Sequence, residues 1–245
     1  MQCLVCEKGV DAYKEFGLPP RMGQCPHCRA KPRHRELSWF FQKFVELGSG
    51  SELLEVGPSK VATTHFVQEK FIGKARYTSI DIRKLKHHDK LQAPHRFMEM
   101  DATDLKLPDQ SLDAVIFNNA LPYIHEDVKA MREIRRCLKP SGFAIMNVSL
   151  ELPKTRSIAE LRRENPALYT DEYLAENGTE WAYGEDYFDR LKSAGFFTWR
   201  FPILEFAGKK LFSEQLFREH GELFLCFSSQ RACEEFQLKC RSAIK

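Results

Sequence analysis

The chain has 245 residues, a formal net charge of +3 and a hydrophobic content of 43%. This length accommodates one α/β domain with a small appendage, and the composition is that of a globular protein rather than a disordered one. No apolar run reaches the roughly 18 residues of a membrane span, and the first residues lack the apolar segment of a signal peptide. We therefore expect a cytoplasmic protein with no membrane partner, and a charge this small does not by itself indicate a nucleic-acid partner.

Four cysteines near the N-terminus form two pairs with the same spacing. Cys3 and Cys6 are one pair, and Cys25 and Cys28 follow after 18 further residues. Two such pairs are typical of a zinc ribbon, in which four thiolates bind one tetrahedral Zn²⁺ and leave no position open for water. We therefore expect a structural zinc that takes no part in the chemistry. A redox dithiol or a pair of disulfides are the alternatives.

Residues 1–35 lack apolar periodicity and contain several prolines, so this segment cannot form a core unaided. We expect a zinc-binding segment at residues 1–35 and a larger domain at 36–245. The basic run from Lys31 to Arg35 lies at their junction. One interpretation is a positively charged edge for an anionic substrate such as RNA phosphate or a nucleotide. The other is a solvated linker whose arginines pair with acids at the start of the next helix.

The larger domain begins with a helical pattern at residues 36–47 and then alternates between strands and helices. Helices are predicted at 61–71 and 127–138, the second followed by a turn at 138–142. Strands that alternate with helices at this spacing indicate a parallel sheet with helices on its faces. The predicted strands are 52–56, 77–80, 96–100, 114–118 and 142–149.

The pattern changes in the last third of the chain. Residues 150–182 are polar and helix-prone, which suggests a lid or an insertion over the strand ends. Residues 183–194 are predicted to be helical, and 199–206 and 222–228 to form an antiparallel pair of strands. A further helical pattern follows residue 229.

Polar residues end the predicted strands in order, where a parallel α/β sheet binds its ligands. Glu55 and Gly57 end the first strand, Asp81 the second, Asp101 the third and Asn118 the fourth. Asp81 lies 24 residues after Gly57, close to the ~20 expected for a carboxylate that binds ribose hydroxyls. The turn has one glycine where a dinucleotide fingerprint has three.

This set, with Leu-Lys-Pro-Ser-Gly at positions 138–142, resembles the motifs of class I S-adenosylmethionine-dependent methyltransferases of the type 11-like group. The cysteine pairs, the basic run after them and the segment from Tyr183 to Phe196 also resemble a bacterial group with an N-terminal zinc-binding segment. The resemblance implies a Rossmann-like sheet with helices on both faces, and S-adenosylmethionine as the cofactor. The single glycine is consistent with it, because this cofactor has no pyrophosphate.

The resemblance also implies roles for individual residues. The backbone at Glu55, Gly57 and Pro58 would approach the methionine part of the cofactor, where a side chain on the glycine would crowd it. Asp81 would hold the ribose hydroxyls.

Three further residues would complete the cofactor site. Asp101, with Ala102 beside it, would meet the adenine amino group, and Asn118 would lie near the methyl group. Each polar residue also has a purely structural interpretation, since Asp101 can cap residues 103–105 and Asn118 can simply end a strand.

The acceptor side is where this sequence departs from the group. Relatives carry a Glu-His pair after the fourth strand, whereas this chain has Leu121-Pro122-Tyr123-Ile124. We expect Tyr123 or His125 to orient the acceptor or to remove its proton, with Glu180 and Tyr183 as alternatives.

Three functions are compatible with the sequence. The leading one is methyl transfer to a small-molecule or sugar-like acceptor. The second is methylation of rRNA or tRNA, with the zinc segment binding the RNA. The third is a catalytically inactive binding protein that retains the fold. The sequence does not indicate an oligomeric state.

Overall fold

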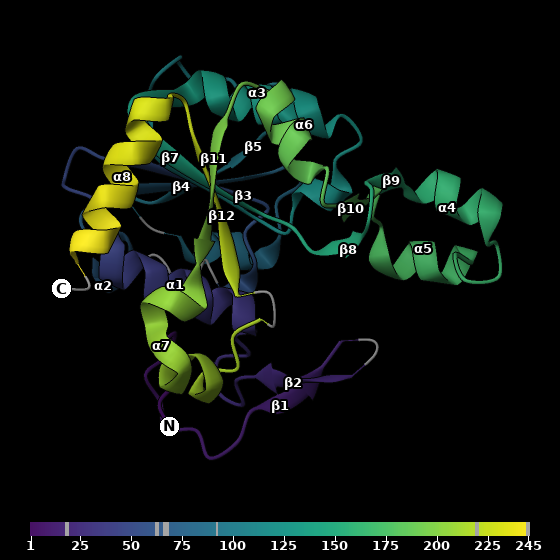
Figure 1. Ribbon diagram of the computed structural model, residues 1–245, viewed down its shortest axis with the longest axis horizontal. Helices are drawn as coiled ribbons and strands as arrows, with labels where there is room; N and C mark the ends of the chain where they lie inside the picture. Colours follow the sequence, from purple (N-terminus) through teal and green to yellow (C-terminus); the bar gives the residue numbers. More distant parts are fainter. Residues whose placement is uncertain (18–19, 62–63, 66–68, 92, 219–220, 244–245) are drawn as a thin grey trace.

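The computed structural model describes residues 1–17, 20–61, 64–65, 69–91, 93–218 and 221–243. Its centre is a seven-stranded sheet with the strand order β11-β12-β7-β6-β3-β4-β5 (Figure 1). β12 is antiparallel to both of its neighbours, and the other neighbouring pairs of this sheet are parallel. The strands are β3 (Glu52–Val56), β4 (Arg76–Asp81), β5 (Arg96–Glu99), β6 (Leu112–Asn118), β7 (Leu138–Asn147), β11 (Phe197–Pro202) and β12 (Glu222–Phe227).

The strand order reverses beside β3. The chain runs outward from β3 through β4 to β5, and then returns to β6 on the other side of β3. In open parallel sheets, ligands bind in the crevice outside the carboxyl ends of the strands at such a switch point. The structure confirms the predicted Rossmann-like α/β fold, and it places the ends of β3 and β6 at the expected ligand edge.

Helices cover both faces of the sheet (Figure 1). α1 (Pro32–Phe44), α2 (Glu69–Ile72) and α8 (Gln230–Ser242) contribute to one hydrophobic core. α3 (Asp127–Cys137) and α6 (Tyr187–Ser193) contribute to the core on the other face. Among the described residues, no helix is long and apolar enough to cross a membrane.

The apolar spacing of α1 explains its position on the sheet. Leu37, Phe40, Phe41 and Phe44 recur at three- and four-residue intervals, and all four are buried. The ring of Phe40 lies 5.1 Å from that of Phe201 on β11, in an edge-to-face arrangement. Each such side chain contributes about 1.5–3 kcal/mol through burial, so this stripe fixes the helix against the sheet.

The N-terminal segment packs on the same side of the molecule. Its hairpin consists of β1 (Lys14–Phe16) and β2 (Arg21–Gln24). Cys3 and Val5 belong to the same core as α1. α1 begins at Pro32, so one continuous helix crosses the position between residues 35 and 36 where the sequence suggests a domain boundary.

Residues 150–184 form an insertion that extends away from the main sheet (Figure 1). A three-stranded sheet with the order β8-β10-β9 forms its base. The predicted helices are present, whereas strands this short have no detectable period in the sequence. The elements are β8 (Leu150–Leu152), β9 (Arg156–Ser157), α4 (Ile158–Glu164), α5 (Asp171–Asn177) and β10 (Trp181–Gly184).

Two element predictions in the last third of the chain are wrong in part. The helix predicted from residue 183 is replaced at its start by β10, where Gly184 allows the strand to approach the Lys154 backbone; an added Cβ would lie 2.4 Å from it. The strand predicted to reach residue 206 ends at Pro202, and α7 (Ile203–Glu214) follows. Ile203 and Phe206, three residues apart, both face the core.

The turn predicted at residues 138–142 is the first part of β7. The pairing of β7 with β6 changes register between Leu112 and Ala114, and this irregularity accommodates the proline and the glycine. The helix predicted at 61–71 lies partly outside the described residues, because 62–63 and 66–68 are not described. Residues 60–61 and α2 are helical.

Candidate functional site

The four N-terminal cysteines converge on one point. Their Sγ atoms all lie within 4.8 Å of one another, with 3.9 Å between Cys3 and Cys28 and 3.8 Å between Cys6 and Cys25. Four sulfurs at 2.3 Å from a tetrahedral Zn²⁺ would be about 3.8 Å apart. All four are free thiols, so the structure does not contain the alternative disulfide pairs. The donor set and its spacing fit a zinc ion.

The two cysteine pairs have the same backbone geometry. In each, the residue after the second cysteine has a positive φ, 58° at Glu7 and 63° at Arg29. Its N–H donates to the carbonyl of the first cysteine, at 2.8 Å from Glu7 to Cys3 and 3.0 Å from Arg29 to Cys25. Non-glycine residues seldom adopt this φ, so the repeated conformation indicates a specific requirement of the thiol arrangement.

The basic run after the cysteines is mostly buried. Arg35 is fully buried, donates to the carbonyls of Gly23, Ala30 and Gln215, and stacks on the ring of Tyr13 at 4.0 Å. His34 is 5% exposed and lies 3.3 Å from the Ser59 hydroxyl, which belongs to the loop after β3. The interpretation as a solvated linker is therefore wrong. These residues attach the cysteine segment to the sheet and to the predicted cofactor loop.

The loop after β3 depends on Gly57. Its φ is +61°, and an added Cβ would lie 2.9 Å from the Cβ of Ala120. The Gly57 N–H donates to the Ile80 carbonyl at 2.9 Å, which ties the loop to β4. Pro58 is buried, and its carbonyl accepts a hydrogen bond from His87 at 3.1 Å. A larger side chain at this turn would therefore be strained and crowded.

Glu55 lies inside the protein rather than at the open edge. Its carboxylate is buried and accepts a hydrogen bond from the Tyr77 hydroxyl at 2.6 Å. Burial raises the pKa of Glu55 to about 8, although the Tyr77 hydrogen bond opposes the shift. The carboxyl is therefore largely protonated at neutral pH.

The other predicted cofactor residues follow the ends of their strands. Asp81 ends β4, and its carboxylate accepts a hydrogen bond from the Arg83 N–H at 3.3 Å. Asp101 is exposed and accepts one from the Thr103 N–H at 2.8 Å, while Ala102 is buried. Asp81 and Asp101 therefore retain carboxylate lone pairs that a ligand can use.

Asn118, at the end of β6, has a buried Oδ1 atom with no hydrogen-bond partner. The next residue, Asn119, has a φ of +60° and a buried Oδ1 that is likewise unpaired. Buried polar atoms are almost always hydrogen-bonded, because desolvation without a partner costs about 1–3 kcal/mol. They are two of eight such atoms among the described residues, and their position at the ligand edge of the sheet is compatible with a bound molecule that supplies the missing donors.

The two candidate bases are in the loop that follows β6. Tyr123 ends the short helix η3 (Leu121–Tyr123) and is 56% exposed. His125 is also exposed, and its Nδ1 lies 3.4 Å from the Glu180 carboxylate. The structure brings His125 and Glu180 together at the surface, whereas Tyr183 lies in the hydrophobic core.

Tyr183 is fully enclosed in the core and has a structural partner. Its hydroxyl donates to the buried Asp127 carboxylate at 2.8 Å, and Arg190 donates to the same carboxylate at 2.5 and 3.0 Å. Burial is the main cause that raises the pKa of Tyr183 well above its usual range. The segment that begins at Tyr183 therefore holds the base of the insertion against α3, and Tyr183 is not available as a base.

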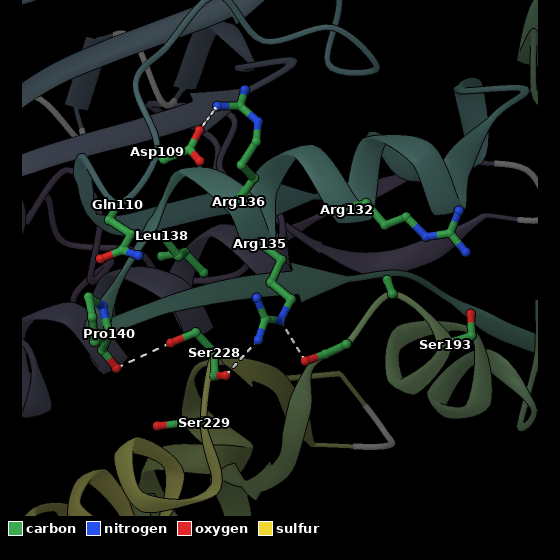
Figure 2. A pocket seen from close by; sticks show the side chains of 12 residues that line it. Asp109, Gln110, Arg132, Arg135, Arg136, Leu138, Pro140, Ser193, Ser228 and Ser229 are labelled. Carbon is green, nitrogen blue, oxygen red and sulfur yellow. Dashed lines mark hydrogen bonds and ion pairs between the residues drawn. The ribbon is translucent and has the colours of Figure 1, made fainter.

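Two of the cavities among the described residues bear on the site. One, of about 630 Å³, lies where α3 ends and β7 begins, which is the edge opposite the predicted cofactor residues (Figure 2). The other, of about 460 Å³, is lined by Asn119, by Glu222 and Phe224 of β12, and by Lys31 and Arg33 at the start of α1. The second cavity adjoins the end of β6, which sequence reasoning did not anticipate because its lining residues come from distant parts of the chain.

Comparisons with known proteins agree with this geometry. Residues 54–146 match the methyltransferase domain family. A search of curated protein sequences finds no match. Because the matched segment is less than half of the chain, it identifies a methyltransferase domain at the centre of the sheet rather than the chain as a whole.

Several solved structures with similar folds are methyltransferases or complexes that contain one. One is a chain from the complex between the Haloferax volcanii Trm112 methyltransferase activator and a methyltransferase (15% identity, 81% of this chain, 91% of that chain, TM-score 0.56). Another is an S-adenosylmethionine-dependent methyltransferase from Mesorhizobium loti (14% identity, 81% and 98% coverage, TM-score 0.52). A third is Burkholderia thailandensis 1,6-didemethyltoxoflavin-N1-methyltransferase with its substrate and S-adenosylhomocysteine (15% identity, 80% and 76%, TM-score 0.50). At these identities the likeness shows the fold, which is that of S-adenosylmethionine-dependent methyltransferases.

Proposed function

We propose that this protein binds S-adenosylmethionine at the carboxyl ends of β3, β4 and β6 and transfers its methyl group to a small-molecule acceptor. The observation that carries the proposal is the pair of buried, unpaired amide oxygens of Asn118 and Asn119 beside the Gly57 turn. The residues fit the cofactor, because an ammonium group supplies donors for such oxygens and Asp81 has lone pairs for ribose hydroxyls.

The chain itself would supply alignment and a base. The cofactor provides a methyl group on a positively charged sulfur. The acceptor atom forms a bond to the methyl carbon while the carbon–sulfur bond breaks, so the acceptor loses a proton. We assign this role to His125, because its Nδ1 lies 3.4 Å from the Glu180 carboxylate, which can orient the imidazole. Tyr123, in the same loop, would orient the acceptor.

Calorimetric titration with S-adenosylmethionine and S-adenosylhomocysteine tests the cofactor site. We expect Asp81→Ala to weaken binding by about 10–100-fold, since a hydrogen bond to a charged group contributes about 1.5–3 kcal/mol. Asp109→Asn is the matched control, because Asp109 is exposed and lies at the opposite edge of the sheet. Wild-type protein that binds neither compound would exclude the proposed activity.

We also propose that Cys3, Cys6, Cys25 and Cys28 bind one structural Zn²⁺. Their four thiols fill a tetrahedral site, so the metal would stabilise the segment and would not contact the acceptor. Elemental analysis of the purified protein should find one zinc per chain, and Cys25→Ser should lose it. Cys137→Ser is the control, because Cys137 is a buried thiol outside the cluster. Stoichiometric zinc in Cys25→Ser, or none in the wild type, would contradict the site.

A further inference from the structure

The cavity at the start of α1 has a strongly cationic wall. Arg21, Lys31 and Arg33 line it, and among the described residues none of the three forms an ion pair with a carboxylate. Lys31 and Arg21 instead lie over the ring of Phe16, at 5.3 and 5.1 Å. This wall combines the hairpin of the cysteine segment with the first turn of the helix that follows it.

Arg33 is the least satisfied of these cations. Its Nε atom is buried and has no hydrogen-bond partner. Burial is the main cause that lowers the pKa of Arg33 to about 10, and the nearby Arg218 lowers it further. A buried guanidinium ordinarily has its donors filled, because leaving charged donors unpaired costs more than leaving neutral ones.

The position of Arg33 in α1 makes its unpaired positive charge more unfavourable. The N-terminus of a helix carries a partial positive charge that favours acidic residues and disfavours cations. The first turn of α1 has no acidic residue; Lys31 precedes the helix as its N-cap, and Arg33 is the second residue of the helix. An anion bound in the cavity would neutralise both the side chains and the helix end.

The opposite wall does not supply that anion. Arg200 binds the carboxylates of Glu185 and Glu222, and Arg218 binds Glu36 at 2.6 Å. These charges are paired within the wall. Glu151 also lines the cavity, but it is exposed and therefore stays solvated.

We propose that this cavity is the acceptor pocket of the methyltransferase and that it takes a small organic molecule bearing a phosphate or a carboxylate, bound by Arg33. The volume of about 460 Å³ is in the range of small-molecule sites. Asn119 connects the pocket to the strand end where the cofactor is proposed to bind. The acceptor role rests on the proposed methyltransferase function, whereas anion binding by Arg33 does not.

The test uses the full chain with zinc bound, with and without saturating S-adenosylhomocysteine. The calorimetric probes are inorganic phosphate, glucose 1-phosphate and glucuronate, so that phosphate and carboxylate recognition are separated. We expect at least one probe to bind and R33Q to weaken it by about 10-fold or more, the effect of losing one charge-assisted contact. R231Q is the control, because Arg231 is exposed on α8 and paired with Glu235.

Each of the other possible results contradicts either the anion site or the methyltransferase proposal. Equal weakening by R33Q and R231Q would show a general charge effect and would overturn the pocket. Absence of probe binding while S-adenosylhomocysteine binds would overturn the anion site alone. Failure of S-adenosylhomocysteine to bind, with Arg33-dependent probe binding intact, would contradict the methyltransferase proposal and leave the anion site. Tighter, steeply salt-dependent binding of a ten-nucleotide oligouridylate would instead indicate an RNA surface.

Discussion

Arginines line both cavities, and individual arginines differ in whether their donors have hydrogen-bond partners. In the cavity of Figure 2, Arg135 donates to the carbonyls of Gly195 and Ser228, and Arg136 binds the carboxylates of Asp109 and Glu133. In the cavity at the start of α1, Arg33 has no such partner. The arginines of the larger cavity are thus either paired, as Arg135 and Arg136 are, or exposed to solvent, as Arg132 is. Arg33 in the smaller cavity differs from them in having a buried Nε atom without a partner.

Arg35 is the strongest test of this comparison, because it lies two residues from Arg33 and each of its three guanidinium nitrogens donates a hydrogen bond. Arg35→Met removes the guanidinium donors to the Gly23 and Gln215 carbonyls and one of the two donors to the Ala30 carbonyl, so we expect the free energy of unfolding to fall by about 3–5 kcal/mol. Chemical denaturation followed by fluorescence measures the change. A loss under 1 kcal/mol would contradict the comparison, because it would show that an arginine whose donors are hydrogen-bonded does not stabilise this fold.

Glu55 extends the comparison to a carboxyl group. Its folded pKa of about 8 exceeds the ordinary value of 4.5, so the folded state binds a proton that the unfolded state releases. This contribution is complete below pH 4.5 and is lost as the pH rises toward 8. Between pH 6 and pH 8 we expect a loss of about 2 kcal/mol, measured by denaturation at each pH.

Glu55→Gln is the matched variant for that measurement, because an amide keeps the acceptor for the Tyr77 hydroxyl and does not titrate. The variant should show a shallower decline over the same pH range. An identical pH dependence in both proteins would assign the effect to another group.

Arg136 represents the paired arginines of the larger cavity. It is about one-third exposed, and it contacts Glu133, Asp109 and two carbonyls. Because part of this network is solvated, we expect Arg136→Gln to destabilise the protein by about 1–2 kcal/mol. Anion affinity, measured with the same probes as for R33Q, should not change. Weakened probe binding would place an anion site in this cavity instead.

Arg33 should show the smallest effect on stability. Arg33→Met removes a buried charge without breaking a hydrogen bond, so the melting temperature should stay the same or rise. Differential scanning calorimetry of this variant beside Arg35→Met makes the contrast direct. A loss as large as that of Arg136→Gln would show that Arg33 is structural.

Much of the fold follows from local patterns in the sequence. The central strands β3 and β6 are largely buried and read as nearly continuous apolar runs. β3 matches its predicted range, and β4, β5 and β6 agree within two residues. Short strands such as β9 have too few residues for a period, and α7 was missed because two of its residues extend an apolar run from β11.

The residues of the candidate site could be predicted only where a residue's own type, or its spacing from its neighbours in the chain, determines its function. The cysteine pairs are defined by spacing, and their sulfurs converge as expected. Tyr183 could not be placed, because its role depends on Asp127, which is 56 residues away in the chain. Glu55 was assigned to the strand end, whereas its side chain alternates inward and meets Tyr77 on the neighbouring strand.

The amino-acid sequence by itself determined the order of the central strands β3 to β7, the strand-end acids and the two cysteine pairs, since each depends on neighbours in the chain. The tertiary structure alone decided which charged groups are satisfied. Lys31, Arg33 and Arg35 are alike in the sequence, but burial against Gln215 fills the donors of Arg35 and leaves Arg33 beside a cavity. Hydrogen-bond partners come from distant segments, so only the folded chain distinguishes a structural cation from one that can bind a ligand.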